Sequence, residues 1–149
     1  LTAGPALAAT LEVRDGGGIQ QTVNQAQPGD IILVYPGTYH ESVYIDKDNI
    51  TLRGVVEQNN WPTLDGEKKL NDAILYSGND ITVEWLKIVK YKGNGIMGQA
   101  GNNFIIRYNW VVVRMDAVDD DEIRELVLDA WRMVVPKRVA AEHLGDDQE

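Results

Sequence analysis

One short pattern recurs along the chain and limits what it can fold into. The segments "DNITLRG", "NDITVEW" and "NNFIIRY" each place a pair of Asn or Asp residues before an alternating apolar stretch. The first apolar residues of these segments, spaced 31 and 23 residues apart, are Ile50, Ile81 and Phe104. The second ones keep the same offset and are Leu52, Val83 and Ile106. Because such repeats bury one inner row of side chains when successive coils stack, they predict an all-β solenoid.

A second series of residues supports the same period. Ile74 in "AILYSGN" and Ile96 in "GIMGQAGN" are 22 residues apart, and each leads through Gly and Asn to the next unit. The longer interval of 31 residues contains "VVEQNNWPTLDGEKKL", which we interpret as a coil with a surface insertion near Trp61 and Pro62. Lengthening a loop costs only ~0.6 kcal/mol per doubling, so a solenoid tolerates such an insertion.

The chain before the repeats changes from a helical to an extended pattern. In "GGGIQQTVNQAQPGD" the apolar residues Ile19, Val23 and Ala26 share one helical face, and Pro28 with Gly29 ends the helix. Alternation with a period of two begins in "IILVY" and continues after the turn "PGTY" in "YHESVYI". Because the helix has one narrow apolar stripe, we expect it to lie against the first coil.

Composition restricts the possible partners. The chain has 149 residues, enough for one domain, and a net charge of −9, which argues against binding of DNA or RNA. It lacks cysteine, and its two histidines, His40 and His143, form no pair at metal-ligand spacing. No apolar run approaches the roughly 20 residues of a membrane-spanning helix. We therefore expect no nucleic acid, membrane or zinc partner.

A family resemblance covers the chain from about Gly18 to Asn109. The segments "IQQTVNQAQPGDIILVYPGTYHESVYI", "NITLRG", "PTLDG" and "NDITVEWLKI" together resemble the first coils of right-handed parallel β-helix proteins, the pectin-lyase-like superfamily with its NosD-like and carbohydrate-binding relatives. The resemblance implies a short right-handed parallel β-helix over residues 9–109, with a helix capping its N-terminal end. This fold hosts lyases, hydrolases, epimerases and non-enzymatic binders, so it identifies no activity.

The segment from Trp110 to Glu149 has a different character. In "DDDEIRELVLDAWRMVV" the apolar residues form one broad helical stripe, made of Ile123, Leu126, Val127, Ala130, Trp131 and Val134. Asp119 with Glu122 three residues later is a capping-box-like start, and Pro136 limits the helix. We expect residues 110–149 to form a strand and an amphipathic helix that caps the C-terminal end of the solenoid. A docked cap predicts a monomer, and an open end predicts self-association.

This segment has a resemblance of its own. "WVVVRMDAVDDDEIRELVLDAWRMVVPKRVAAEHLG", Trp110 to Gly145, is similar to the closing strand and helix of the MmcQ/YjbR family of small α+β proteins. Two family signatures thus meet near Asn109, and we interpret the chain as a chimera, either natural or engineered. The alternative is a native β-helix protein whose own cap converged on this pattern.

The first residues, "LTAGPALAAT", favour an exported protein. Ala6-Leu7-Ala8 has the small-x-small form that signal peptidase reads, so residues 1–8 are interpreted as the remnant of a signal peptide. The alternative is an Ala-rich N-terminus without such a role. We expect a secreted or periplasmic protein, or a cytoplasmic one if the chain was engineered or recombined.

The resemblance also suggests where catalytic groups could lie. Lyases of this fold combine Ca²⁺-binding carboxylates with an Arg or Lys base, and related hydrolases use facing carboxylates. The candidate carboxylates are Asp46, Asp48, Asp65, Asp80 and Glu84, and the candidate bases are Arg53, Lys87, Lys90 and Lys92. Turn capping accounts for the three that lead coils or turns, Asp48, Asp65 and Asp80. We interpret Glu84 with Lys87 as a solvated pair and His40 as a surface residue, so we expect no catalytic residue, metal ligand or cofactor. We expect the protein to bind Ca²⁺ only if it is a lyase.

Sugar binding requires less machinery than cleavage, because aromatic rings beside polar groups suffice. The available aromatic residues are Trp61, Tyr76, Trp85, Tyr91 and Tyr108. We predict that the contacts come from Trp61, Asp65, Tyr76, Lys87, Lys90 and Tyr91, although Trp61 could simply anchor its loop. The favoured function is a non-catalytic scaffold or truncated module derived from an exported carbohydrate-active family. The alternatives are a polysaccharide-binding or polysaccharide-cleaving protein, lyase or hydrolase, and a protein-interaction module that uses the acidic C-terminal helix.

Overall fold

The computed structural model describes residues 7–112 and Arg124, and residues 7–112 form a parallel β-solenoid of about four turns. Within this range the chain forms one short helix, α1 (Ile19–Gln25), and twelve strands. The strands of the first part are β1 (Thr10–Val13), β2 (Ile31–Val34), β3 (Gly37–Tyr39), β4 (Val43–Ile45), β5 (Thr51–Gly54) and β6 (Pro62–Asp65). Those of the second part are β7 (Ile74–Tyr76), β8 (Thr82–Glu84), β9 (Lys87–Val89), β10 (Ile96–Gly98), β11 (Ile105–Arg107) and β12 (Trp110–Val111).

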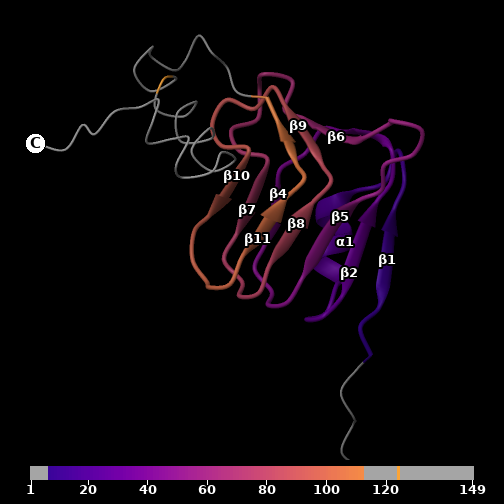
Figure 1. Cartoon of the computed structure of the whole chain (residues 1–149), viewed down its shortest axis with the longest axis vertical. Coiled ribbons are helices and arrows are strands. Elements are labelled where there is room, and N and C mark those ends of the chain that lie inside the picture. Colours follow the sequence, from indigo (N-terminus) through magenta and orange to yellow (C-terminus); the bar gives the residue numbers. More distant parts are fainter. Residues whose placement is uncertain (1–6, 113–123, 125–149) are drawn as a thin grey trace, which may run out of the picture. The chain divides into compact units, whose positions relative to one another are not determined.

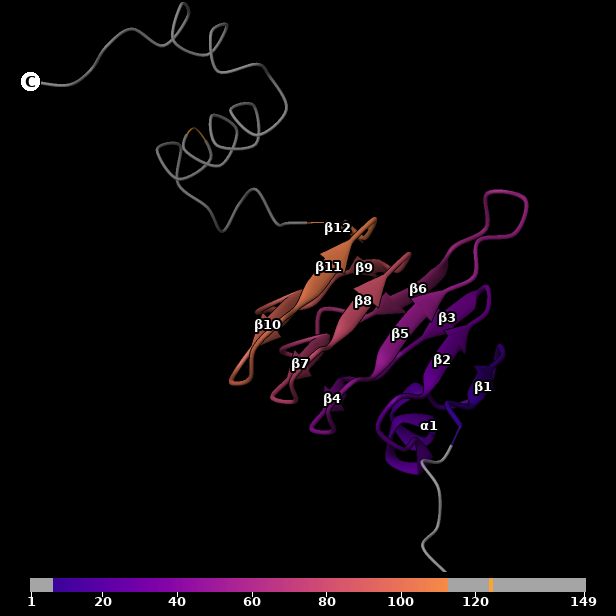
Figure 2. The same cartoon turned by 60° about the horizontal axis from the view of Figure 1, so that its bottom comes forward.

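The strands of successive coils stack into three parallel sheets. The five-stranded sheet has the order β1-β2-β5-β8-β11, the four-stranded sheet β3-β6-β9-β12, and the three-stranded sheet β4-β7-β10. Figure 1 shows the five-stranded sheet across the front of the molecule, and Figure 2 shows the coils succeeding one another from α1 and β1 to β10, β11 and β12. The predicted all-β solenoid is therefore confirmed.

The strand register confirms the repeat spacing found in the sequence. The five-stranded sheet aligns Leu52 with Val83 and Val83 with Ile106, and the three-stranded sheet aligns Ile74 with Ile96. The extra residues of the longer interval lie in the connections on either side of β6. One of these turns back on itself through an antiparallel bridge between Glu57 and Asn60, directly before Trp61. The predicted insertion is thus a surface hairpin.

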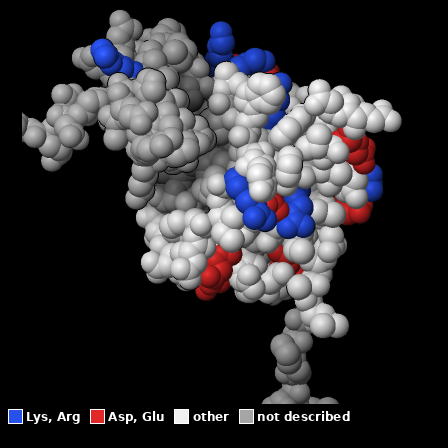
Figure 3. Space-filling model, in the orientation of Figure 1, with Lys and Arg blue, Asp and Glu red and all other residues white. Residues whose placement is uncertain are grey.

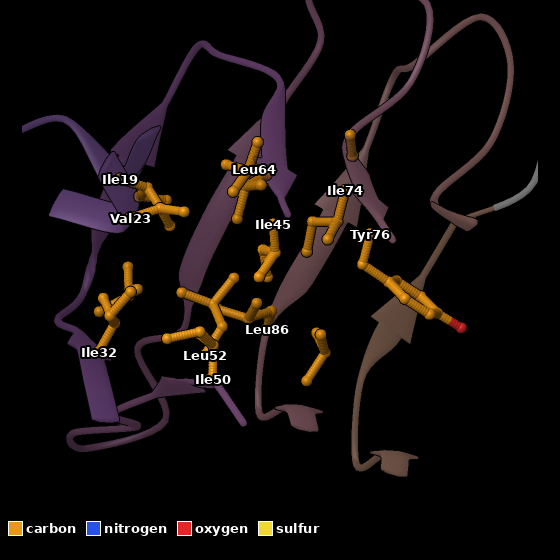
Figure 4. Packing of buried hydrophobic residues seen from close by; sticks show 14 of the residues in the cluster. Ile19, Val23, Ile32, Ile45, Ile50, Leu52, Leu64, Ile74, Tyr76 and Leu86 are labelled. Atoms are coloured by element: carbon orange, nitrogen blue, oxygen red, sulfur yellow. The ribbon is translucent and has the colours of Figure 1, made fainter. Parts of the chain in front are cut away.

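The inner rows of the earlier coils form one continuous core, whereas Phe104 and Ile106 of the last coil, predicted to share it, are 41% and 43% exposed. Ile32, Leu52 and Val83 are fully buried from the five-stranded sheet, and Leu64 and Ile74 are fully buried from the other two sheets. Figure 4 shows such side chains pointing toward one another between the sheets. Fully burying an aliphatic side chain of this size contributes roughly 1.5 to 3 kcal/mol, which explains why the coils stack in one register.

Helix α1 covers the N-terminal coil as predicted, but the first coil supplies its end groups. Ile19 and Val23 are buried. Gly18 offers no side-chain cap, and the Glu41 carboxylate instead accepts hydrogen bonds from the backbone N–H groups of Ile19 and Gln20, both at 2.8 Å. At the other end the Lys47 ammonium donates to the carbonyl oxygens of Val23, Asn24 and Ala26. A carboxylate at the N-terminus and an ammonium at the C-terminus both complement the helix dipole.

Each coil enters the five-stranded sheet through a corner built on small polar residues. A residue with positive φ recurs there, at Gly29 (100°), Asn49 (55°), Asp80 (56°) and Asn103 (62°). Gly, Asn and Asp adopt this left-handed conformation at the lowest cost. We call these four residues the polar corner, and its composition explains why Asn and Asp begin every repeat.

The predicted C-terminal cap and signal remnant lie largely outside the described residues. Of the segment expected to extend and close the solenoid, the structure places β12, which pairs with β9 as a further strand. The rest of the cap, including the stripe from Ile123 to Val134, falls outside the described range, as do the first six residues of the chain.

Candidate functional site

The corner at which coils leave the five-stranded sheet differs in chemistry from the polar corner. Trp85 and Tyr108, in equivalent positions of successive coils, have φ values of 61° and 56°. Bulky residues rarely adopt this conformation, and each such position costs on the order of 1 kcal/mol. Backbone strain of this kind is concentrated at binding sites, so the corner is a candidate functional site.

Three aromatic rings form a row along this edge of the solenoid. The ring centroids of Trp85 and Tyr108 are 4.7 Å apart with an interplanar angle of 25°, and those of Trp61 and Trp85 are 6.0 Å apart. Stacked rings contribute ~0.5 to 1.5 kcal/mol beyond their buried area, which offsets part of the backbone strain. We call Trp61, Trp85 and Tyr108 the aromatic corner.

Charged side chains form ion pairs between neighbouring strands, at the residues that directly precede Trp85 and Tyr108 in the sequence. Glu84, at the end of β8, accepts a hydrogen bond from Arg53 Nε at 2.5 Å and one from Arg107 Nε at 2.6 Å. Its side chain is only 2% exposed. Burial raises the pKa of Glu84, but the hydrogen bonds from Arg107 and Arg53 outweigh burial, and the pKa is lowered overall. Figure 3 shows basic groups around acidic atoms on this face of the molecule.

This arrangement corrects the expected pairing of Glu84 with Lys87. Glu84 belongs to the five-stranded sheet and Lys87 to the four-stranded sheet, and Glu84 is buried rather than solvated. The carboxylate is covered because Arg53 and Arg107, in register on the neighbouring strands, fold over it from both sides.

A pocket of about 440 Å³ lies beside the aromatic corner. Its walls come from the inserted loop and from the outward surface of the four-stranded sheet. The lining residues are Pro36, Gly37, Thr38, Asn59, Asn60, Trp61, Thr63 and Lys87. The pocket therefore combines one indole ring with two amides, two hydroxyls and one ammonium group. We call it the Trp61 pocket.

Two of the predicted sugar contacts thus meet in one place, whereas two others form a separate pair. Trp61 and Lys87 both line the Trp61 pocket. Lys90 Nζ lies 2.6 Å from Asp65 Oδ2, and Asp65 Oδ1 accepts the backbone N–H of Glu67 at 2.9 Å. Burial raises the pKa of Asp65, but the hydrogen bonds from Lys90 and the Glu67 amide outweigh burial, and the pKa is lowered overall.

The remaining two predicted contacts, Tyr76 and Tyr91, are buried. Tyr76 is 5% exposed, and its ring packs against Phe104 with centroids 4.7 Å apart. The Tyr91 hydroxyl donates to the carbonyl oxygen of Glu41, and burial raises its pKa. Both rings therefore serve the core rather than the surface.

The other catalytic candidates are dispersed. Asp48 Oδ1 accepts the backbone N–H of Asn79, and Asp80 Oδ1 accepts the side-chain amide of Asn103, so both carboxylates bond to the next coil instead of capping their own turns. Asp46 and Lys92 are exposed, and the His40 ring is 3.0 Å from the carbonyl oxygen of Asp65. Among the residues that the structure describes, no group of three or more His, Asp or Glu side chains could hold a metal ion.

The outward row of the four-stranded sheet contains residues that sequence reasoning missed. The register aligns Thr38 with Thr63, Thr63 with Lys87, and Lys87 with Trp110. Lys87 and Trp110 are 23 residues apart, as are Trp85 and Tyr108. Extending the repeat beyond its buried positions would have revealed both outward pairs.

Comparisons with known proteins add no relative. No family model matches the chain, and neither the curated proteins nor the solved structures contain a match. Within residues 7–112, no helix is long and apolar enough to cross a membrane. The parallel β-solenoid is therefore established by the structure alone, and membership of the pectin-lyase-like or MmcQ/YjbR families stays a prediction.

Proposed function

We propose that the solenoid binds a polysaccharide without cleaving it and that one sugar ring occupies the Trp61 pocket. The observation that carries this proposal is the aromatic corner. Two bulky rings adopt a left-handed backbone conformation there, next to a pocket whose other groups are amides and hydroxyls. Such a combination suits a ligand with one apolar face and many hydroxyl groups.

The chemistry of the Trp61 pocket matches a sugar ring in detail. Trp61 is half-buried and lines the pocket, so its indole can contact the C–H face of a pyranose. Asn59, Asn60 and the Thr38 hydroxyl can each donate and accept hydrogen bonds, whereas the Thr63 hydroxyl donates to the Trp61 carbonyl oxygen at 3.2 Å and is left as an acceptor. Ligand sites of this kind pair an apolar wall with a few placed polar groups.

The state of the carboxylates supports binding rather than hydrolysis. Glycoside hydrolysis requires one carboxyl group that stays protonated, and hence a raised pKa. The pKa values of Glu84 and Asp65 are instead lowered by their cationic partners. None of the eight described residues that line the Trp61 pocket carries a carboxylate. A general acid is therefore missing from the site as described.

The resemblance to pectin-lyase-like β-helix proteins supports the ligand class, since many of those proteins act on polysaccharides. We accordingly propose a recombined member of that exported group, whose sequence from Trp110 onward is similar to the MmcQ/YjbR family. The signal-like residues Ala6-Leu7-Ala8 support the proposal of a secreted or periplasmic location.

A binding and cleavage experiment on the full chain tests the proposal. Affinity electrophoresis and calorimetry with pectate, alginate and neutral glucans should show binding to at least one polymer. Trp61→Ala should weaken that binding about tenfold or more, which corresponds to ~1.4 kcal/mol. Tyr44→Ala removes an aromatic residue that is 40% exposed on the three-stranded sheet and should leave affinity unchanged.

Two results would contradict the proposal. The first is equal affinity of the wild type and Trp61→Ala for every polymer, or no binding by either. The second is release of new reducing or unsaturated ends by the wild type, with or without Ca²⁺, because that would show cleavage.

A further inference from the structure

We infer that the bound polysaccharide extends from the Trp61 pocket along the outward row of the four-stranded sheet to a second aromatic subsite at Trp110. This inference rests on the proposed function and adds the direction and the minimum length of the ligand. It starts from the in-register row Thr38, Thr63, Lys87 and Trp110, which lies on four successive strands.

The row has the dimensions of a short oligosaccharide. Neighbouring strands lie about 4.8 Å apart, so its four positions extend about 14 Å along the solenoid axis. The first three positions line the Trp61 pocket, and the fourth lies one strand beyond it. The strand that follows Trp61, β6, is two strands from β12, about 10 Å, so a sugar stacked on Trp61 needs at least one further sugar to reach Trp110.

Trp110 is the ring best placed to form a second subsite. It is 58% exposed, and the Lys87 ammonium lies 5.6 Å from its ring centroid. Trp85 cannot take this role, because Trp61 and Tyr108 both adjoin its ring. A sugar stacking on Trp110 would lie on the same sheet surface as the pocket.

Lys87 connects the two subsites. Its side chain lines the pocket and reaches toward Trp110, and no carboxylate lies within 4.0 Å of its ammonium group among the described residues. The ammonium group has three N–H donors and can therefore bind the oxygen atoms of the sugar between the subsites. The proposed order along the ligand is thus indole, ammonium, indole.

The experiment measures affinity against chain length. Oligosaccharides of two to six sugars, prepared from the polymer that the wild type binds, are titrated into the full-length wild type, Trp110→Ala and Trp110→Phe. Wild-type affinity should rise until the ligand spans both rings. Trp110→Ala should lose about five- to tenfold for the longer ligands and keep its affinity for the disaccharide, and Trp110→Phe should recover part of the loss.

The outcomes separate this inference from the proposed function. Unchanged disaccharide affinity in Trp110→Ala shows that the Trp61 pocket is intact, so a selective loss for longer ligands supports the second subsite. Equal loss for all lengths, or no loss, overturns the subsite while polysaccharide binding stands. Failure of the wild type to bind any polymer overturns both.

Discussion

The polar corner and the aromatic corner solve the same backbone problem with opposite residues. Both turn the chain at an edge of the five-stranded sheet, and both contain residues with φ near 60°. The polar corner uses residues that favour this conformation, such as Asn49 and Asp80. The aromatic corner uses Trp85 and Tyr108, which do not. The first corner therefore needs little support from the rest of the molecule, whereas the second must be held in place.

The support for the aromatic corner comes from side chains that flank it. Glu84 and Arg107 directly precede the two strained residues and are paired with each other. Asn109 adds to this, because its side chain accepts the backbone N–H of Leu86 and donates to the carbonyl oxygen of Val83. A strained backbone conformation persists only where the surrounding structure fixes it. These hydrogen bonds fix the backbone next to Trp85 and Tyr108. The polar corner thus serves the solenoid alone, whereas Trp85 in the aromatic corner also packs against Trp61, the ring that we assign to the ligand.

The largest expected effect comes from removing the charge that supports the aromatic corner. Glu84→Gln leaves Arg53 and Arg107 without their carboxylate, and we expect it to destabilise the fold by about 2 kcal/mol. Denaturant unfolding checks this value. Glu12→Gln is the control, since Glu12 pairs with Arg14 at an exposed position, and it should leave the unfolding midpoint nearly unchanged. If Glu84→Gln is as stable as the wild type, the aromatic corner does not depend on the ion pairs of Glu84.

The same substitution predicts a change in the pH profile. Because the folded state lowers the pKa of Glu84, its stabilising effect is fully present above the unfolded-state value of about 4.3 and is lost as pH falls through the lower folded-state pKa. Stability of the wild type should therefore fall more steeply below about pH 4.3 than that of Glu84→Gln. Parallel acid profiles of the two proteins would contradict this linkage.

A smaller effect is expected from the polar corner. Asn49→Ala keeps the exposed position but removes a residue that tolerates positive φ, so it should destabilise by about 1 kcal/mol. The neighbouring Asp46→Ala, outside the corner, serves as the control in the same unfolding measurement. Polysaccharide affinity should be equal in both variants, because neither residue lines the Trp61 pocket.

The smallest stability change is expected at the aromatic corner itself. Trp85→Asn replaces a strained residue by one that favours the left-handed conformation, while the ring contacts with Trp61 and Tyr108 are lost. The two effects are similar in size, so stability should change by less than about 1 kcal/mol. Polysaccharide affinity should nevertheless fall about threefold as Trp61 loses its neighbour. A large loss of stability with unchanged affinity would make the aromatic corner purely structural.

Much of the fold was predictable because the buried positions of successive coils recur in the sequence as regularly spaced apolar residues. The alignment of Leu52, Val83 and Ile106 followed from spacing alone, since a parallel solenoid repeats its inner row once per coil. The surface hairpin before Trp61 was predictable as an excess of residues over that period. Choosing which alternate residues of β2 face inward needed the structure, because both faces of "IILV" are apolar, and Ile32 and Val34 are the buried pair.

The candidate site was less predictable because it lies on outward positions. Trp61 and Lys87 were named as sugar contacts, but their convergence depends on the register between β6 and β9. Tyr76 and Tyr91 carry the same aromatic signal as Trp61 and are buried. Residue type alone could not separate the two cases. The burial of Glu84 depended on arginines 31 residues before it and 23 residues after it, a distance at which local pattern carries no information.

The hydrogen bond from the Tyr91 hydroxyl to the Glu41 carbonyl has a consequence for how the chain unfolds. Coils of a solenoid contact mainly their neighbours, so such proteins can open one coil at a time from an end. This bond joins residues 50 positions apart, and Glu41 also holds the first turn of α1. Opening at Tyr91 would therefore loosen the helix at the far end. We expect the coils between them to exchange their amide hydrogens as one cooperative unit.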